Sequence, residues 1–232
     1  MSHYTGRVQE LLLEPYQNAS ARLQMPADAL PRAGQYLQVH DPADPEEVLP
    51  SQAFPVGPPE LDRRSGESQL AVSVPLRAAW QPGTELELRG PLGQGFKLPR
   101  QLRRLALVAL GSGPGRLLPL VSEAARRLQI VLFAASEPAN LSLEVEVQPF
   151  KALNEGLAWA DFLALDVPVD RLDELPSLLE ADTTRPPAGQ ALVHVTMPCG
   201  GLADCGLCTV QARRGTRLVC KQGPVFSLDE LL

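Results

Sequence analysis

The sequence predicts an α+β, multi-domain chain: an antiparallel β-barrel, then a small α/β domain with a parallel sheet, then a cysteine-rich C-terminal module. Three observations lead to this prediction. Short strand-like runs separated by turn residues fill positions 1–98, buried strands alternate with helical segments over 99–190, and every cysteine lies within 191–232. A length of 232 residues suits one or two domains with a small appended module.

Composition places the chain among globular proteins and limits its partners. Hydrophobic residues make up 44% and charged residues 21%, and the net charge is −6 at pH 7. With this acidic balance we expect no nucleic-acid partner and no membrane partner. The longest apolar run, at 105–110, is too short to cross a bilayer. The N-terminus lacks a cationic leader followed by an apolar core, so we expect a cytoplasmic, reducing location.

Residues 1–98 predict the barrel. Alternating runs typical of short antiparallel strands occur at 6–13, 21–25, 35–40, 69–76 and 84–90. Six prolines interrupt the pattern between His40 and Glu60. Because proline cannot donate to a central strand ladder, we expect this stretch to form a long irregular loop.

Residues 99–190 follow the pattern of a βαβ domain. A buried strand at 103–110 leads through a glycine-rich turn into an amphipathic helix at 116–128, and a second buried strand follows at 130–135. Strands of this continuous apolar kind, joined by a helix, are typical of a parallel sheet with helices on its faces. We therefore expect a small α/β domain here.

The turn after the first of these strands contains Gly111, Gly113 and Gly115. Backbone N–H groups and the helix dipole at such a turn can receive a phosphate of a nucleotide. A tight connection from strand to helix needs glycines for steric reasons as well. Both interpretations stay open, and no clear second nicotinamide motif follows before the end of this domain.

The four cysteines give the most specific signal in the chain. Cys199, Cys205, Cys208 and Cys220 lie within 22 residues of one another. In a reducing compartment such a group more naturally binds a thiophilic metal centre than forms two disulfides. The grouping is three plus one, the layout of a plant-type [2Fe–2S] loop, in which each of two irons needs two thiolates. Structural zinc commonly uses two short-spaced pairs, and only one such pair occurs here.

Glycines fit the same interpretation. Gly200, Gly201 and Gly206 would let the backbone wrap closely enough to point N–H groups at the sulfurs. We therefore assign the four cysteines as ligands of a [2Fe–2S] cluster, with a zinc site and free thiols as alternatives. Arginines between the third and fourth cysteines would favour a reduced, more anionic cluster, although a solvated surface explains them equally well: Arg213, Arg214 and Arg217.

The string at 197–232 resembles the end of the electron transfer subunits of class 1B dihydroorotate dehydrogenases, where a cluster loop is followed by a Cys and a Gly-Pro-Val-Phe segment, here 223–226. The gap between the first two cysteines is five residues rather than the family's usual four. The resemblance extends more weakly through "RAGQYLQVH", "RGPLGQGFKL" and "LVALGSGPGRLLPL". It implies the ferredoxin–NADP reductase architecture: a flavin-binding-like barrel (1–98), a nucleotide-binding-like domain (99–190) and a cluster module (191–232).

The resemblance also implies an electron path from a nicotinamide through FAD and the cluster to the FMN of a separate catalytic subunit. We interpret the chain as the electron-transfer component of an oxidoreductase complex, with no catalytic residues of its own. Its partner would be a dihydroorotate-dehydrogenase-like catalytic subunit containing FMN, or another dehydrogenase. The alternative is a zinc-stabilised, non-redox scaffold derived from a reductase fold.

The flavin motif departs from the family's pattern. An Arg-Pro-Phe-Ser type motif is replaced by Gln52, Ala53, Phe54 and Pro55, so the cation and the hydroxyl are both missing. Loss of a charge-assisted contact costs about 1–2 kcal/mol. A Gly-x-Gly-Thr phosphate-binding stretch is also missing before the last barrel strand. Gln52 and Phe54 are the candidate flavin contacts, and we expect FAD binding to be weakened or lost.

Overall fold

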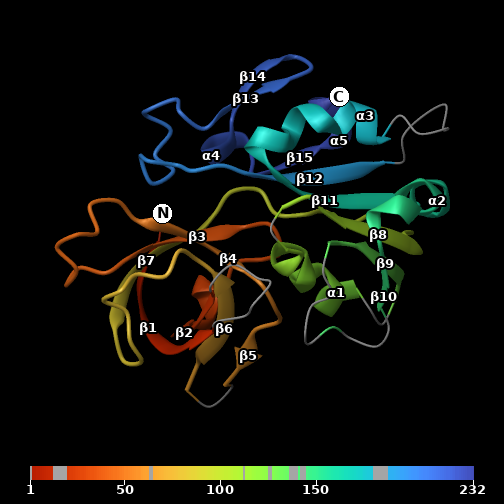
Figure 1. Cartoon of the computed structure of the whole chain (residues 1–232). Coiled ribbons are helices and arrows are strands. Elements are labelled where there is room, and N and C mark those ends of the chain that lie inside the picture. Colours follow the sequence, from red (N-terminus) through yellow and green to blue (C-terminus); the bar gives the residue numbers. More distant parts are fainter. Residues whose placement is uncertain are drawn as a thin grey trace.

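The computed structural model describes residues 2–12, 20–62, 65–111, 113–124, 127–135, 141, 145–179 and 188–232. These residues form a β-barrel beside a larger, mostly parallel sheet, and the C-terminal segment lies along the far edge of that sheet (Figure 1). Among the described residues, no helix has the length and apolar character needed to cross a membrane.

The barrel consists of six antiparallel strands with a short seventh at its edge. The strand order is β2-β1-β7-β3-β4-β6-β5, and a pairing of β2 with β6 closes the barrel. The strands are β1 (His3–Leu12), β2 (Ser20–Pro26), β3 (Tyr36–His40), β4 (Ser51–Pro55), β5 (Glu60–Leu61), β6 (Glu67–Ser73) and β7 (Glu85–Leu92), with a 3-10 turn η1 at Ala27–Ala29. The antiparallel barrel expected from the sequence is confirmed.

Strand β4 corrects the expected irregular loop between His40 and Glu60. Residues 41–50 and 56–59 are irregular, but Ser51–Pro55 between them pairs with β3 on one side and β6 on the other. Pro50 precedes the strand and Pro55 ends it, so the prolines flank the ladder rather than interrupt it. Burial of Ala53 and Phe54 supplies the apolar face that the proline content concealed.

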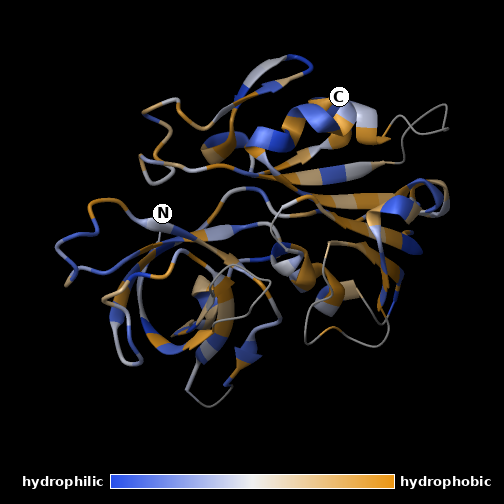
Figure 2. Ribbon diagram, viewed as in Figure 1, coloured by the Kyte–Doolittle hydropathy of each residue, from blue (hydrophilic) through white to orange (hydrophobic). Residues whose placement is uncertain are grey.

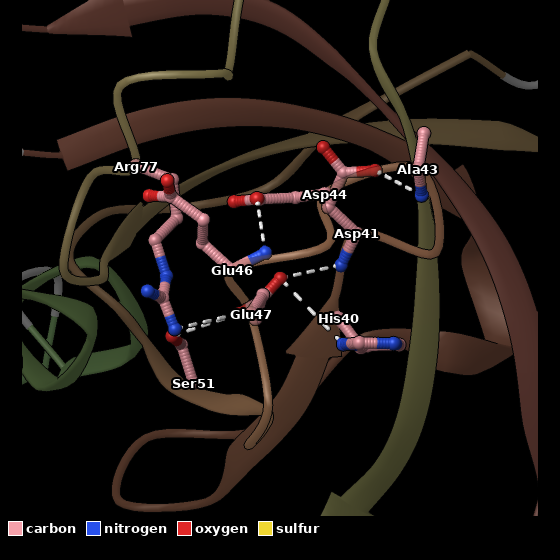
Figure 3. A network of polar contacts seen from close by, with 8 residues as sticks. All are labelled: His40, Asp41, Ala43, Asp44, Glu46, Glu47, Ser51 and Arg77. Carbon is pink, nitrogen blue, oxygen red and sulfur yellow. Dashed lines mark hydrogen bonds and ion pairs between the residues drawn. The ribbon is translucent and has the colours of Figure 1, made fainter.

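The buried carboxylate of Glu47 organises the irregular half, residues 41–50 (Figure 3). It accepts hydrogen bonds from the backbone N–H of Asp41 at 2.6 Å and the Ser51 hydroxyl at 3.2 Å. Nη2 of Arg77 lies 3.5 Å from Oε1, the oxygen that Ser51 contacts, and Nδ1 of His40 lies 3.6 Å from Oε2. A buried charge needs such partners, so this network fixes the path of the loop.

The second sheet has the order β10-β9-β8-β11-β12-β15. Its first five strands are parallel and the last is antiparallel to its neighbour. They are β8 (Arg104–Ala109), β9 (Gln129–Phe133), β10 (Val145–Gln148), β11 (Phe162–Pro168), β12 (Gly189–His194) and β15 (Val225–Ser227). The predicted parallel sheet is confirmed, and its central strands are predominantly hydrophobic (Figure 2).

Short helices cover both faces of this sheet. Helix α1 packs into one buried cluster, whereas α2 and α3 pack into another on the opposite face. The helical elements are η2 (Gly115–Leu117), α1 (Leu118–Ala124), η3 (Phe150–Ala152), α2 (Leu153–Trp159), η4 (Val169–Glu174) and α3 (Leu175–Leu179).

The C-terminal segment is continuous with the parallel sheet. The expected division between residues 190 and 191 falls inside β12, and β15 returns to pair with β12. Between these strands lie a hairpin of β13 (Thr209–Ala212) and β14 (Gly215–Leu218) and then helix α4 (Val219–Gln222); α5 (Leu228–Leu231) follows β15.

The 223–226 segment joins the barrel to the parallel sheet. The N–H of Gln94, just after the barrel, donates to the Gly223 carbonyl at 2.7 Å, and the N–H of Val193 donates to the Pro224 carbonyl at 2.8 Å. A β-carbon at Gly93 would clash with Cδ of Pro224. The closing motif seen in the sequence therefore holds the two sheets together.

Candidate metal centre

The four cysteines come from two parts of the C-terminal segment. Cys199, Cys205 and Cys208 belong to the cysteine loop, residues 198–208, which connects β12 to β13. Cys220 lies on α4, after the β13–β14 hairpin has turned the chain back. Cys208 and Cys220 are buried, Cys199 is partly exposed and Cys205 is exposed, so the group extends from the core to the surface.

The sulfurs come together as two pairs. The Cys205 side chain lowers the pKa of Cys199, and the Cys208 side chain raises the pKa of Cys220, so each cysteine acts on its neighbour. Cys199 also acts electrostatically on Cys220, which places the two pairs near each other. In the described part of the chain, no three His, Cys, Asp or Glu side chains are close enough together to surround one metal ion.

The cysteine loop turns repeatedly through left-handed conformations. Gly200, Gly201 and Gly206 have φ values of +59°, +78° and +70°, and Ala203 has a φ of 67°. Glycine adopts such angles without steric cost, whereas alanine pays a penalty. The three glycines therefore adopt the left-handed angles that the sequence led us to expect. Ala203 adopts such an angle as well, and nothing in the sequence indicated strain at that position.

Backbone N–H groups point at the first cysteine. Burial raises the pKa of Cys199, but hydrogen bonds from the backbone N–H groups of Cys205, Asp204 and Leu202, and from the Cys205 thiol, lower it to about 6. Burial, together with Cys208 and Cys199, raises the pKa of Cys220 to about 12. A hydrogen bond from the Ala203 N–H opposes this rise. The loop thus stabilises negative charge on sulfur where its N–H groups converge.

The cysteine loop rests on the barrel. A β-carbon at Gly201 would lie 2.8 Å from the Tyr36 hydroxyl, and one at Gly200 would lie 3.1 Å from Cγ of Pro50 and 3.2 Å from Nη2 of Arg89. The Tyr36 hydroxyl donates to Sδ of Met197 at 3.3 Å. Strand β3, strand β7 and the end of the 41–50 loop therefore form the floor under the cysteine loop.

The candidate flavin contacts lie on β4. The Phe54 ring is 2% exposed. Its centroid lies 5.5 Å from that of Tyr36 and 5.8 Å from that of His194, with the Arg116 guanidinium 5.9 Å away. Nε2 of Gln52 is buried and has no hydrogen-bond partner among the described residues. Gln52 thus offers a free donor, whereas neighbouring side chains already cover the Phe54 ring.

The glycine-rich turn is occupied by an ion pair. Arg116 follows Gly115, and its Nε donates to both carboxylate oxygens of Asp166 at 3.2 and 3.0 Å. Asp166 is fully buried, and a β-carbon at Gly111 would lie 3.4 Å from Nη2 of Arg116. Burial raises the pKa of Asp166, and Arg116 opposes that rise. Gly113 is exposed in part beside this pair, while Ser112 lies outside the described residues.

Sequence reasoning missed Arg116, Asp166 and His194, which meet Phe54 at the junction of the two sheets. Asp166 carried a signal, because it is the one acid inside the apolar run at 162–167. Arg116 gave none, since an arginine at the start of a helix is ordinarily a surface residue.

Comparisons with known proteins agree with this architecture. No protein-family model matches the chain. The structure of an NADH-dependent reduced ferredoxin–NADP oxidoreductase, described for flavin-based electron bifurcation, matches 97% of this chain and 88% of that chain with a TM-score of 0.69 at 14% identity. The flavohem-like FAD/NAD-binding domain of nitric oxide dioxygenase from Vibrio cholerae matches 82% and 98% with a TM-score of 0.54 at 15% identity. The fold is that of the ferredoxin reductases.

A relative found by sequence comparison identifies the family of proteins to which the chain belongs. The electron transfer subunit of dihydroorotate dehydrogenase B (NAD(+)) from Shouchella clausii is 30% identical over 183 residues, which is 67% of this chain and 68% of the relative. The chain belongs to this family of electron transfer subunits. The resemblance drawn from the cysteine loop and the closing segment is confirmed.

The buried ion pair yields a prediction for stability. Asp166→Asn leaves the Arg116 cation buried without a counter-charge, which should lower the free energy of unfolding by about 3–5 kcal/mol. Urea denaturation followed by circular dichroism measures the loss. Replacing both partners, as Arg116→Met with Asp166→Leu, should recover most of it. A loss below about 1 kcal/mol in the single variant would show that Asp166 is neutral in the fold.

His194 yields a prediction for pH dependence. Burial first, and then the neighbouring Arg116, lower the pKa of His194 from 6.5 to about 4. The unfolded chain therefore binds a proton between these values that the folded chain does not. The contribution of neutral His194 to the free energy of unfolding is fully present above pH 6.5. It should be lost as the pH falls towards 4, which lowers the free energy of unfolding by about 3 kcal/mol. His194→Gln should remove this part of the slope, and equal slopes in both proteins would contradict the assignment.

Proposed function

We propose that this chain carries single electrons on a [2Fe–2S] cluster bound by Cys199, Cys205, Cys208 and Cys220, and exchanges them with a partner oxidoreductase subunit. The observation that supports this most directly is the arrangement of the sulfurs as two adjacent pairs under converging N–H groups. Two irons require two thiolates each, and the chain offers one pair for each iron.

A zinc site is supported less well. Structural zinc needs four ligands arranged around one ion and commonly takes them from two short-spaced cysteine pairs, whereas the spacing here is three plus one. The N–H groups that point at Cys199 favour an anionic centre whose charge increases on reduction. Zinc does not change its oxidation state and so makes no such demand.

The bound cluster would supply a centre that accepts and returns one electron. The residues of this chain bind and orient it: the buried Cys208 and Cys220 fix it to the core, and the exposed Cys205 brings its other end to the surface. Leu202 and Leu207 flank that end and are 53% and 69% exposed. Apolar side chains presented in this way are typical of a surface that another protein covers.

The partner follows from the family. The Shouchella relative is by name a subunit of dihydroorotate dehydrogenase B (NAD(+)). We therefore propose a dihydroorotate-dehydrogenase-like catalytic subunit containing FMN, or a related dehydrogenase, as the partner in the cytoplasm. The same proposal treats the barrel, the α/β domain and the cluster module as separate functional units. In the fold, however, the pairing of β12 with β15 joins the cluster module to the α/β domain.

The flavin-binding neighbours, among them an FAD/NAD-binding domain, support FAD more than the sequence motif did, although FAD fits the described residues only in part. The free Nε2 of Gln52 suits a polar group of a ligand, as the sequence suggested. A flavin ring, however, could stack on Phe54 only if Arg116 and His194 moved away from it. The glycine-rich turn likewise has the Arg116 guanidinium against it. Electron entry from a partner requires no such movement.

Metal analysis tests the cluster. Protein purified without oxygen should be reddish-brown and contain about two irons and about two acid-labile sulfides per chain. Dithionite should bleach the colour and produce a paramagnetic resonance signal, and a one-electron oxidant should restore the original spectrum. Cys208→Ser should lose the cluster. One zinc per chain with no visible absorption would refute the proposal in favour of the scaffold.

Two of the three glycines in the cysteine loop, Gly201 and Gly206, give a matched comparison. Gly201→Ala adds a β-carbon 2.8 Å from the Tyr36 hydroxyl at a φ of +78°, whereas Gly206→Ala adds one in open space at a φ of +70°. Both carry a similar backbone cost of about 1–2 kcal/mol. Only Gly201→Ala should push the loop off the barrel, so its iron content after reconstitution should fall well below that of Gly206→Ala. Equal contents would show that the barrel floor does not position the loop.

A further inference from the structure

Arg89 reaches the cysteine loop from a strand of the barrel. It lies on β7 opposite His3 of β1 and Gln38 of β3, so its backbone is fixed in the middle of the sheet. Its Nη2 would be 3.2 Å from a β-carbon at Gly200 and 3.9 Å from one at Gly201. Side chains at these two positions would meet the guanidinium, which therefore lies directly against the loop that carries three of the cysteines.

The charge of Arg89 is not neutralised at close range. Within the described residues it forms no ion pair, whereas Arg7, on the neighbouring strand β1, binds Glu85 at 2.8 Å. Arg89 also borders a cavity of about 230 Å³, whose other ionisable groups are His3, His40 and Glu87. Glu87 lines this cavity without coming within ion-pair distance of Arg89.

The pKa of Tyr36 responds to both the Arg89 guanidinium and the cysteine sulfurs. Burial raises the pKa of Tyr36 well above its usual value; Cys220, Cys208 and Cys199 raise it further, and Arg89 opposes them. Charges act in this way only over short distances in a protein interior. Arg89 and three of the four cysteines thus act electrostatically on the same buried hydroxyl.

The other arginines near the cysteines contribute less. Arg217 lies close in sequence, but its Nε binds Glu230 at 2.8 Å, so its charge is balanced. Arg213 and Arg214 are exposed at the tip of the β13–β14 hairpin, where water and salt screen them. The sequence suggested these three as the source of positive charge, and the structure points instead to a residue more than a hundred positions earlier.

We propose that Arg89 sets the reduction potential of the cluster by holding an unpaired cation under the cysteine loop. The inference rests on the proposed [2Fe–2S] function. A cluster held by four thiolates is anionic and gains a further negative charge on reduction. A fixed cation at its edge stabilises the reduced form more than the oxidised form and so raises the potential. Arg89 acts by its charge and donates no ligand.

The experiment is an equilibrium redox titration of reconstituted variants, followed by visible absorption and paramagnetic resonance. Arg89→Gln and Arg89→Met remove the charge, Arg89→Lys keeps it, and Arg7→Gln removes the same charge from the barrel away from the loop. Iron and sulfide per chain are measured first for every protein, and circular dichroism confirms the fold.

Removing the Arg89 charge should lower the ratio of reduced to oxidised cluster at a fixed potential by about tenfold, which for a one-electron couple is about 59 mV. Arg89→Lys should stay near the wild type, and Arg7→Gln should not shift. Fully loaded Arg89→Gln or Arg89→Met with an unchanged potential, or with a shift no larger than that of Arg7→Gln, would overturn the role of Arg89 alone. A wild-type chain without iron and sulfide would overturn the proposed function as well.

Discussion

The contact between the 223–226 segment and both sheets determines where the fourth cysteine lies. Gln94 N–H and Val193 N–H hold the carbonyls of Gly223 and Pro224 from opposite sides. Cys220 sits on the helical turn immediately before, and the N–H of Gly223 donates to the Val219 carbonyl to close that turn at 3.0 Å. The barrel therefore helps to place a residue near the C-terminus, while the β13–β14 hairpin and the hydrogen bond from Val219 N–H to the Cys208 carbonyl at 3.0 Å bring Cys220 beside Cys208. Gly93 permits this docking, since any side chain there would displace Pro224.

This dependence explains why the core at the junction is shared. One buried cluster contains Tyr36, Phe54 and Leu92 from the barrel and Val193, Val225 and Phe226 from the other sheet, together with Cys208 and Cys220. Burial of such residues stabilises by about 1.5–3 kcal/mol each. The cysteines are part of the apolar surface that joins the domains, so docking of the domains would also support a metal centre bound by these cysteines. A separate cluster module at the end of a linker would lack this coupling.

Local patterns in the sequence were sufficient for the barrel strands, the parallel strands and the four cysteines, because each depends on neighbours close in the chain. Strand β4 was hidden by the prolines that flank it, and β15 was hidden by its length of three residues. The contacts of Arg89 with the cysteine loop and of Arg116 with Asp166 join residues far apart in sequence, and an arginine in isolation looks like a surface residue. The sequence singled out Gln52 as a departure from the family's motif, but only the structure shows that its donor is buried and free.

The two arginines at the junction differ in a way that separates structure from function. Arg116 is almost fully buried and is matched by Asp166, so its charge is cancelled within the fold and its main effect is to orient the groups around Phe54. Arg89 is only partly buried and has no carboxylate partner in the described chain, so its charge is available to act on other charges nearby. A paired ion changes little when an anion is bound a few ångströms away, because its field is already compensated. An unpaired cation beside a group of sulfurs interacts with every change of charge on them, so the barrel that carries Arg89 would influence a centre bound by the cysteines as well as support it.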